Sequence, residues 1–100
     1  HTAEVRAVLG LDNVHLSITS VEMVRGALAT CHAFLREPLA ERNLWKIFRE
    51  TYGNEPFVRI VHDRQGLHRH PEPKILAGSN FADVGWALDE QTGRIVTFCA

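Results

Sequence analysis

Residues 74–85 have the sequence KILAGSNFADVG, and this stretch decides how the whole chain is interpreted. Gly78 and Gly85 interrupt an otherwise largely apolar run, as Gly26 does in residues 23–30, whose sequence is MVRGALAT. Glycines inside apolar segments mark bulges, bends or the close approach of another backbone, because they carry no Cβ. The two stretches therefore predict a bulge, a bend or a close backbone approach at these glycines.

Composition and charge exclude several classes of protein. The chain has 100 residues, enough for at most one domain, and its hydrophobic content of 45% disfavours disorder. Eleven basic and twelve acidic residues give a net charge of −1, so no excess of positive charge points to nucleic acid or an anionic membrane. No uncharged stretch approaches the roughly 20 apolar residues that a membrane-spanning helix needs. We therefore expect a cytoplasmic protein.

Local patterns predict the elements of the N-terminal half. Thr2 to Leu9 fit a short helix that Gly10 can close. Residues Val14 to Thr19 alternate between apolar and polar side chains, which predicts a half-buried strand. Its inward-facing residues would be Val14, Leu16 and Ile18. Residues Met23 to Leu35 stay ambiguous, since their Ala and Leu content favours a helix while Gly26 and Thr30 weaken it.

The second half of the chain predicts one helix and three strands. Pro38 to Gly53 fit an amphipathic helix that covers a sheet, with an apolar face of Leu44, Ile47, Phe48 and Thr51, widened by Trp45 and Tyr52. Phe57 to Val61 predict a short strand with Phe57 and Val61 inward, followed by a polar connection from His62 to Lys74. Phe81 to Leu88 and Arg94 to Phe98 predict a hairpin whose turn ends at Gly93. The sum is an α+β layer.

Cysteines and histidines could carry nucleophilic or metal chemistry. Cys31 and Cys99 share no metal-type spacing, and we expect both to be reduced, buried and inert. His68 and His70 stand two residues apart, but no third ligand is convincingly spaced near them. A solvated loop is the better interpretation, so we predict no metal site.

Arg25 is the candidate for a binding role, because a charge between Val24 and Gly26 in an apolar setting requires a partner. That partner is either a carboxylate of the protein or an anionic ligand, and the sequence leaves both open. Ser79 and Asn80 follow Gly78 in a predicted turn, where such side chains usually bond to nearby backbone groups. The chain has no glycine-rich phosphate loop and no dinucleotide fingerprint.

Blocks along the whole chain resemble a known family. Residues 1–5, HTAEV, look like a His-Thr-x-Glu-Ile segment, and residues 17–30 look like a strand-turn-strand ending in Met-x-Arg-Gly. Residues 52–59 and 74–85 resemble later blocks in the same order. The family is that of the N-acetyl-gamma-glutamyl-phosphate reductases of arginine and lysine biosynthesis, in their C-terminal domain. Residues 70–74, HPEPK, and Arg25 to Ala29 look more like the lysine-pathway branch, which reduces acyl phosphates held on a small acidic amino-group carrier protein.

The resemblance implies a fold and a reaction. It implies a glyceraldehyde-3-phosphate-dehydrogenase-like C-terminal domain, with a mostly antiparallel or mixed sheet covered by helices on one face, and it favours an extended strand over residues 23–35. It implies an NADPH-dependent reduction of N-acetyl-glutamyl phosphate, or of carrier-bound glutamyl or aminoadipyl phosphate, to the semialdehyde. The nucleophilic cysteine and the NADP-binding Rossmann domain would lie outside residues 1–100, and a homodimer or homotetramer is expected.

The same resemblance suggests which residues contact substrate. His1 would lie next to the family's acid–base histidine without being the proton carrier, so we expect no catalytic residue in the segment. His1, Thr19, Ser20 and Arg25 would contact substrate. The start at His1 and the stop after an apolar strand suggest a piece of a longer polypeptide that is inactive alone. The alternative is a free-standing binding or oligomerisation module without catalysis.

Overall fold

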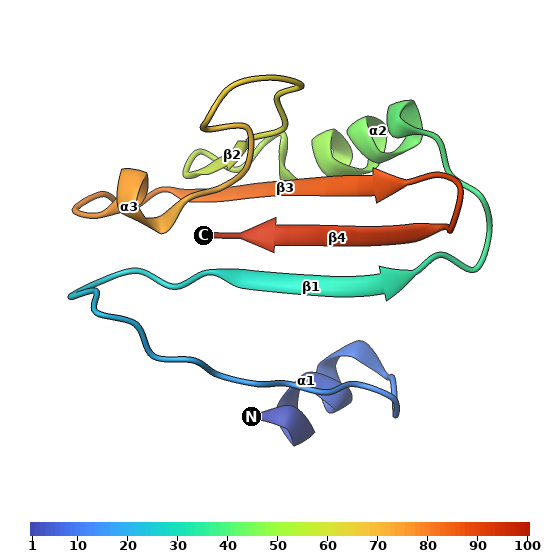
Figure 1. The fold of residues 1–100 in the computed structure, drawn as a ribbon, viewed down its shortest axis with the longest axis horizontal. Helices are drawn as coiled ribbons and strands as arrows, with labels where there is room; N and C mark the ends of the chain where they lie inside the picture. The colour runs from blue at the N-terminus through green and yellow to red at the C-terminus, as the bar shows by residue number, and fades with distance from the viewer.

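The computed structural model describes residues 1–100 and has a mixed four-stranded sheet with a helix packed on it (Figure 1). Along the chain the elements are α1 (Thr2–Leu9), β1 (Ala29–Phe34), α2 (Glu41–Tyr52), β2 (Val58–Ile60), α3 (Pro73–Leu76), β3 (Ala82–Asp89) and β4 (Arg94–Cys99). No helix of this fold has the length and apolar character needed to cross a membrane.

The sheet has the strand order β1-β4-β3-β2. β3 and β4 form the predicted antiparallel hairpin, and Gly93 closes its turn at a φ of 68°. β1 pairs antiparallel with β4, whereas β2 pairs parallel with β3. The predicted α+β class and mixed sheet are therefore confirmed.

Trp86 of β3 is the centre of the core and has no exposed surface. It packs with the buried Leu44 of α2 and Ile95 of β4. The Phe48 ring lies 4.4 Å from the Trp86 ring, and the His62 ring stacks on it at 4.2 Å. The aromatic side chains of α2 and the end of β2 thus meet over one strand of the sheet.

Polar groups are satisfied around the edge of this core. Glu41 accepts a hydrogen bond from the Trp86 indole nitrogen at 2.9 Å, and it lies 3.2 Å from His62 Nε2. His62 donates from Nδ1 to the Trp86 carbonyl at 2.8 Å. Because buried polar groups cost free energy when unpaired, these bonds allow Trp86 to be buried completely.

The predicted helix between Pro38 and Gly53 is present but begins later, at Glu41. The Asn43 side chain accepts a hydrogen bond from the Ala40 N–H at 3.0 Å and caps the helix there. Its buried face is also shifted, since Ile47 is 45% exposed while Trp45 is half-buried. Thr51 is exposed as well, and its hydroxyl donates back to the Ile47 carbonyl.

β2 faces the core with Ile60 and not with the predicted Phe57 and Val61. Phe57 is 56% exposed. The register explains the difference, because β2 places Arg59 directly opposite Asp83, and their side chains form a bidentate ion pair at 2.7 and 3.1 Å. That pair lies on the face opposite Ile60, since successive side chains of a strand alternate.

The connection from His62 to Lys74 runs into the short helix α3, which begins at Pro73. Before α3, Pro71 crosses Gly85 on the sheet face opposite Trp86 and is itself buried. A Cβ at Gly85 would collide with the Val61 carbonyl oxygen and lie 3.0 Å from Pro71 Cδ. The predicted close approach at Gly85 is therefore confirmed, and it seats the connection on the sheet.

The segment before β1 packs against little else. Residues 14–19 form no strand, contrary to the prediction, and Ile18 is 72% exposed. An alternating segment becomes a strand only beside a partner, and no strand of the described residues pairs with it. The strand predicted over residues 23–35 is present only as β1, because Gly26 adopts a φ of 111° ahead of it.

Cys31 and Cys99 are both exposed, which corrects the expectation that they are buried. Every residue of the edge strand β1 is exposed, because no helix covers it. Cys31 lies opposite Thr97 in the sheet, so its side chain shares a face with that of Cys99.

Substituting Gly85 by alanine should lower the free energy of unfolding by about 2 kcal/mol or more, because the new methyl group has no space. Gly10→Ala is the matched control. Gly10 has a φ of 63°, and a Cβ added there would meet no atom within 4 Å. It should therefore lose only the backbone strain of about 1 kcal/mol. Equal unfolding free energies of the two variants in urea would contradict the packing described for Pro71.

His70 should make stability depend on pH. Burial lowers its pKa below the ordinary 6.5, and the positive charge of Arg69 and His62 lowers it further. Its Nδ1 is buried without a hydrogen-bond partner, and its ring lies against Phe98. Since the unfolded chain binds the proton more readily, this contribution to stability is complete above pH 6.5 and is lost as the pH falls below 6.5.

The variant His70→Gln should therefore unfold with a weaker pH dependence below 6.5 than the parent protein. His32→Gln, on the exposed strand β1, is the control and should keep the parent slope. Urea unfolding at a series of pH values measures both. A slope unchanged in His70→Gln would show that His70 titrates alike in the folded and unfolded chain.

Candidate functional site

A pocket of about 230 Å³ lies at the end of the sheet where β3 begins and β4 ends. Its walls are residues 25–27 before β1, residues 73 and 76–81 around α3, and residue 100 after β4. Figure 1 shows these three segments, far apart in the sequence, at the same end of the molecule. A second pocket adjoins it, shares Arg25, Ala77 and Gly78, and adds Glu22 and Lys74.

A glycine holds the two halves of this site together. A Cβ on Gly26 would lie 2.8 Å from Met23 Cε and 3.2 Å from Pro73 Cβ, so a larger residue here would require these side chains to shift. Its φ of 111° is also one that other residues rarely adopt. Arg25 precedes Gly26 and Lys74 follows Pro73, so the contact brings the two cationic residues to one place.

The turn after α3 forms the other wall. Gly78 has a φ of 83°, and Ser79 donates from Oγ to the Leu76 carbonyl at 2.8 Å. The same oxygen accepts from the Phe81 N–H at 3.3 Å. The predicted turn role of Ser79 is confirmed. Asn80, by contrast, makes no side-chain hydrogen bond within the protein.

Phe81 of the pocket wall packs against an arginine of an ion pair and against a second aromatic ring. The Arg59 guanidinium lies 4.9 Å above the Phe81 ring, which meets the Phe57 ring edge-on at 5.8 Å. Hydrogen bonding to the buried Asp83 carboxylate raises the pKa of Arg59 and keeps it charged. Phe81, which lines the pocket, thus packs against Arg59, which is itself bound to Asp83 of β3.

Arg25 is more exposed than its apolar neighbours in the sequence suggest. Its apolar neighbours suggested burial, but Arg25 is exposed and Val24 is fully exposed. Neither Arg25 nor Lys74 forms an ion pair with a carboxylate of the chain. Two cations against the single acid Glu22 leave the site with a net positive charge.

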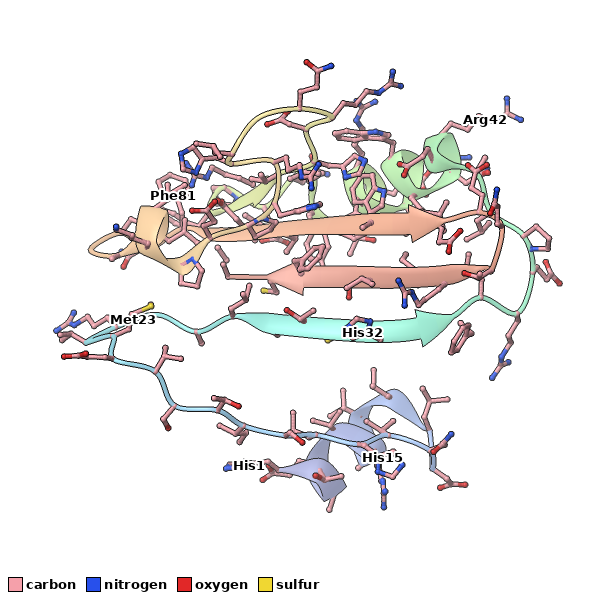
Figure 2. All side chains as sticks on the ribbon, in the orientation of Figure 1. His1, His15, Met23, His32, Arg42 and Phe81 are labelled. Carbon is pink, nitrogen blue, oxygen red and sulfur yellow. The ribbon has the colours of Figure 1, made fainter.

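The other predicted substrate residues lie elsewhere. His1 is at the start of α1, where its Nδ1 lies 3.2 Å from Glu4 Oε2, and Figure 2 shows it well separated from Met23 and Phe81. Thr19 and Ser20 are exposed in the extended segment and line neither pocket. The described fold brings only Arg25 of the four predicted residues into the pocket.

Histidines and cysteines do not join this site. His68 Nδ1 lies 3.0 Å from Glu72 Oε1, while His70 packs on Phe98. No group of three or more His, Cys, Asp and Glu side chains is placed to hold a metal ion. Cys31 and Cys99 line neither pocket.

Sequence reasoning missed Lys74 as a site residue and missed the Arg59–Asp83 pair. Lys74 was assigned to a polar connection, and only the contact between Gly26 and Pro73 shows that it belongs beside Arg25. The sequence signals only that a helix can begin at Pro73, which does not place the Lys74 side chain.

Comparison with known proteins finds relatives that match along the whole chain. The chain is 43% identical to LysW-L-2-aminoadipate 6-phosphate reductase of Deinococcus radiodurans over 101 residues, covering 100% of the chain and 29% of that protein. It is 55% identical over 107 residues to a Thermomicrobium roseum protein provisionally given the same name, covering 100% of the chain and 30% of that protein.

A third relative, from Natronomonas pharaonis, is 48% identical over 100 residues and is provisionally named a LysW-L-2-aminoadipate/LysW-L-glutamate phosphate reductase; the match covers 100% of the chain and 29% of that protein. The chain thus spans about 30% of the length of these relatives. The family described as semialdehyde dehydrogenase, dimerisation domain, matches residues 1–100, and the chain belongs to this family.

Proposed function

We propose that residues 1–100 are the substrate-side part of a reductase that converts a carrier-bound aminoadipyl or glutamyl phosphate to the semialdehyde. The observation that carries this proposal is the pair of adjoining pockets at the end of the sheet. Arg25 lines both pockets and Lys74 lines the second, and these unpaired cations give a positive charge suited to an acyl phosphate. The names of the relatives, which match over 100% of the chain, support the same substrate class. N-acetyl-glutamyl phosphate is the smaller substrate of the related arginine branch.

The chemistry itself requires groups beyond those described here. Reduction of an acyl phosphate by this route uses a thiolate that displaces phosphate and a nicotinamide that delivers hydride. Neither cysteine of the chain lines the pocket. The described residues also do not fit a dinucleotide, because no glycine-rich turn joins a strand to a helix N-terminus.

NADPH and the nucleophile are therefore assigned to other parts of the full-length protein, in a Rossmann domain that precedes this segment. The part of this chain is to bind and orient the anionic substrate. A biosynthetic reductase of this kind works in the cytoplasm, where its reduced cofactor is regenerated. The amino-group carrier named for the relatives would be its macromolecular partner.

The variant Arg25→Gln of the full-length protein should raise KM for the acyl phosphate about tenfold, because one charge-assisted contact is lost, with little change in kcat. The control is Arg36→Gln, an exposed arginine between β1 and α2 that lines neither pocket. Oxidation of NADPH in the presence of the carrier-bound acyl phosphate measures both constants. No oxidation by the parent protein would remove the proposed function.

We also propose that the protein self-associates through surface near β1. The family is named for dimerisation, and β1 carries Phe34, which is 76% exposed. Exposed apolar groups on a sheet edge are typical of interfaces between subunits. Sedimentation should find a dimer or tetramer of the full-length protein.

Phe34→Glu should weaken this assembly, because it places a charge on the uncovered strand. The control is Leu67→Glu, on the connection between β2 and α3, where the leucine is 91% exposed. It should leave the assembly intact. If both variants and the parent protein sediment as monomers, the proposed self-association is wrong.

A further inference from the structure

Two cationic residues, Arg25 and Lys74, line the same pocket. Of the two, only Arg25 is predicted from the sequence to bind substrate. Arg25 precedes Gly26 in the sequence and Lys74 follows Pro73. A Cβ added to Gly26 would lie 3.2 Å from the Cβ of Pro73. Both cations line the pocket that adjoins the main one, and neither is neutralised by an ion pair. Unpaired surface cations are common, but these two line one pocket, beside a contact at Gly26 that a larger residue would disturb.

A neutral donor, Asn80, lies on the wall of the main pocket, which Arg25 also lines. The Asn80 side chain has no partner within the protein, whereas the neighbouring Ser79 hydroxyl is already used in the turn. The backbone N–H groups of Gly78 and Asn80 also donate to no acceptor of the protein. Gly78 lines both pockets and Asn80 lines the main one, so residues with unpaired N–H groups lie on the walls of the site.

We propose that Lys74 and Asn80, together with Arg25, form an oxyanion subsite. It takes a phosphate or carboxylate group, because each of these side chains can donate hydrogen bonds and the cations outnumber the one acid, Glu22. This inference rests on the proposed function only for the identity of the substrate. For an acyl phosphate on an aminoadipate chain, either its phosphate or its free carboxylate fits the subsite.

The test uses the full-length protein with Lys74→Gln, Lys74→Arg and Asn80→Ala. Lys74→Gln should raise KM for the acyl phosphate about five- to tenfold with kcat nearly unchanged, because a charge-assisted contact to bound substrate is lost. Lys74→Arg should restore most of the affinity, which a loss of folding would not allow. Lys46→Gln is the control, since Lys46 lies on exposed α2 surface and pairs with Glu50.

Competition distinguishes the two anions. Inorganic phosphate and glutarate are added separately as inhibitors. The one that binds this subsite should lose affinity in Lys74→Gln and in Asn80→Ala but not in Lys46→Gln. Weakened phosphate inhibition assigns the subsite to the phosphate of the substrate, and weakened glutarate inhibition assigns it to the carboxylate.

Equal KM and equal inhibition in Lys74→Gln and the parent protein would overturn the subsite. Its failure is separable from that of the proposed function. If the parent protein reduces no acyl phosphate, phosphate and glutarate are titrated while the amide NMR signals of Gly78 and Asn80 are followed. Shifts that vanish in Lys74→Gln support the subsite, and signals that do not respond to either anion in the parent protein reject it.

Discussion

The complete burial of Trp86 is the constraint on which the remainder of the fold depends. One face of this side chain receives His62 at the end of β2, while Leu44 and Phe48 bring α2 onto the sheet. Glu41 bonds the indole N–H, so the helix begins where its first side chain can satisfy the core. The alternation of β3 then places Gly85 on the opposite face, where Pro71 crosses it. The helix, the parallel strand and the connection before α3 are thus all positioned by two adjacent residues of one strand.

The site is coupled to that core through β3. Asp83, on the same face of β3 as Gly85, binds Arg59, and Arg59 lies over Phe81 at the pocket mouth. On the other side, Gly26 ties the segment before β1 to Pro73 at the start of α3. The pocket is therefore lined by three segments that lie far apart in the sequence. Arg25 and Lys74 form no ion pair, and the buried carboxylate of Asp83 is bound by Arg59.

Local patterns in the sequence were sufficient for α1, α2, and the hairpin of β3 and β4, whose turns and periodicity are contained within each element. They failed where a partner decides the outcome. The alternation at Val14 to Thr19 predicts a strand, but strand structure requires a ladder that the described residues do not supply. The strand pattern predicts that Phe57 and Val61 face inward, yet the pairing of Arg59 with Asp83 sets the register the other way. Arg25 was found from its neighbours, whereas Lys74 could be joined to it only through a contact between distant glycine and proline residues.

The residues of the pocket also suggest that a reductase of the proposed kind binds substrate and carries out the covalent chemistry on different domains. Binding energy from parts of the substrate that do not react can position the reacting carbon, and such contacts need not lie on the domain that holds the nucleophile. Arg25, Lys74 and Asn80 offer hydrogen-bond donors but neither a thiol nor a base. They would therefore bind an anion without taking part in the covalent step.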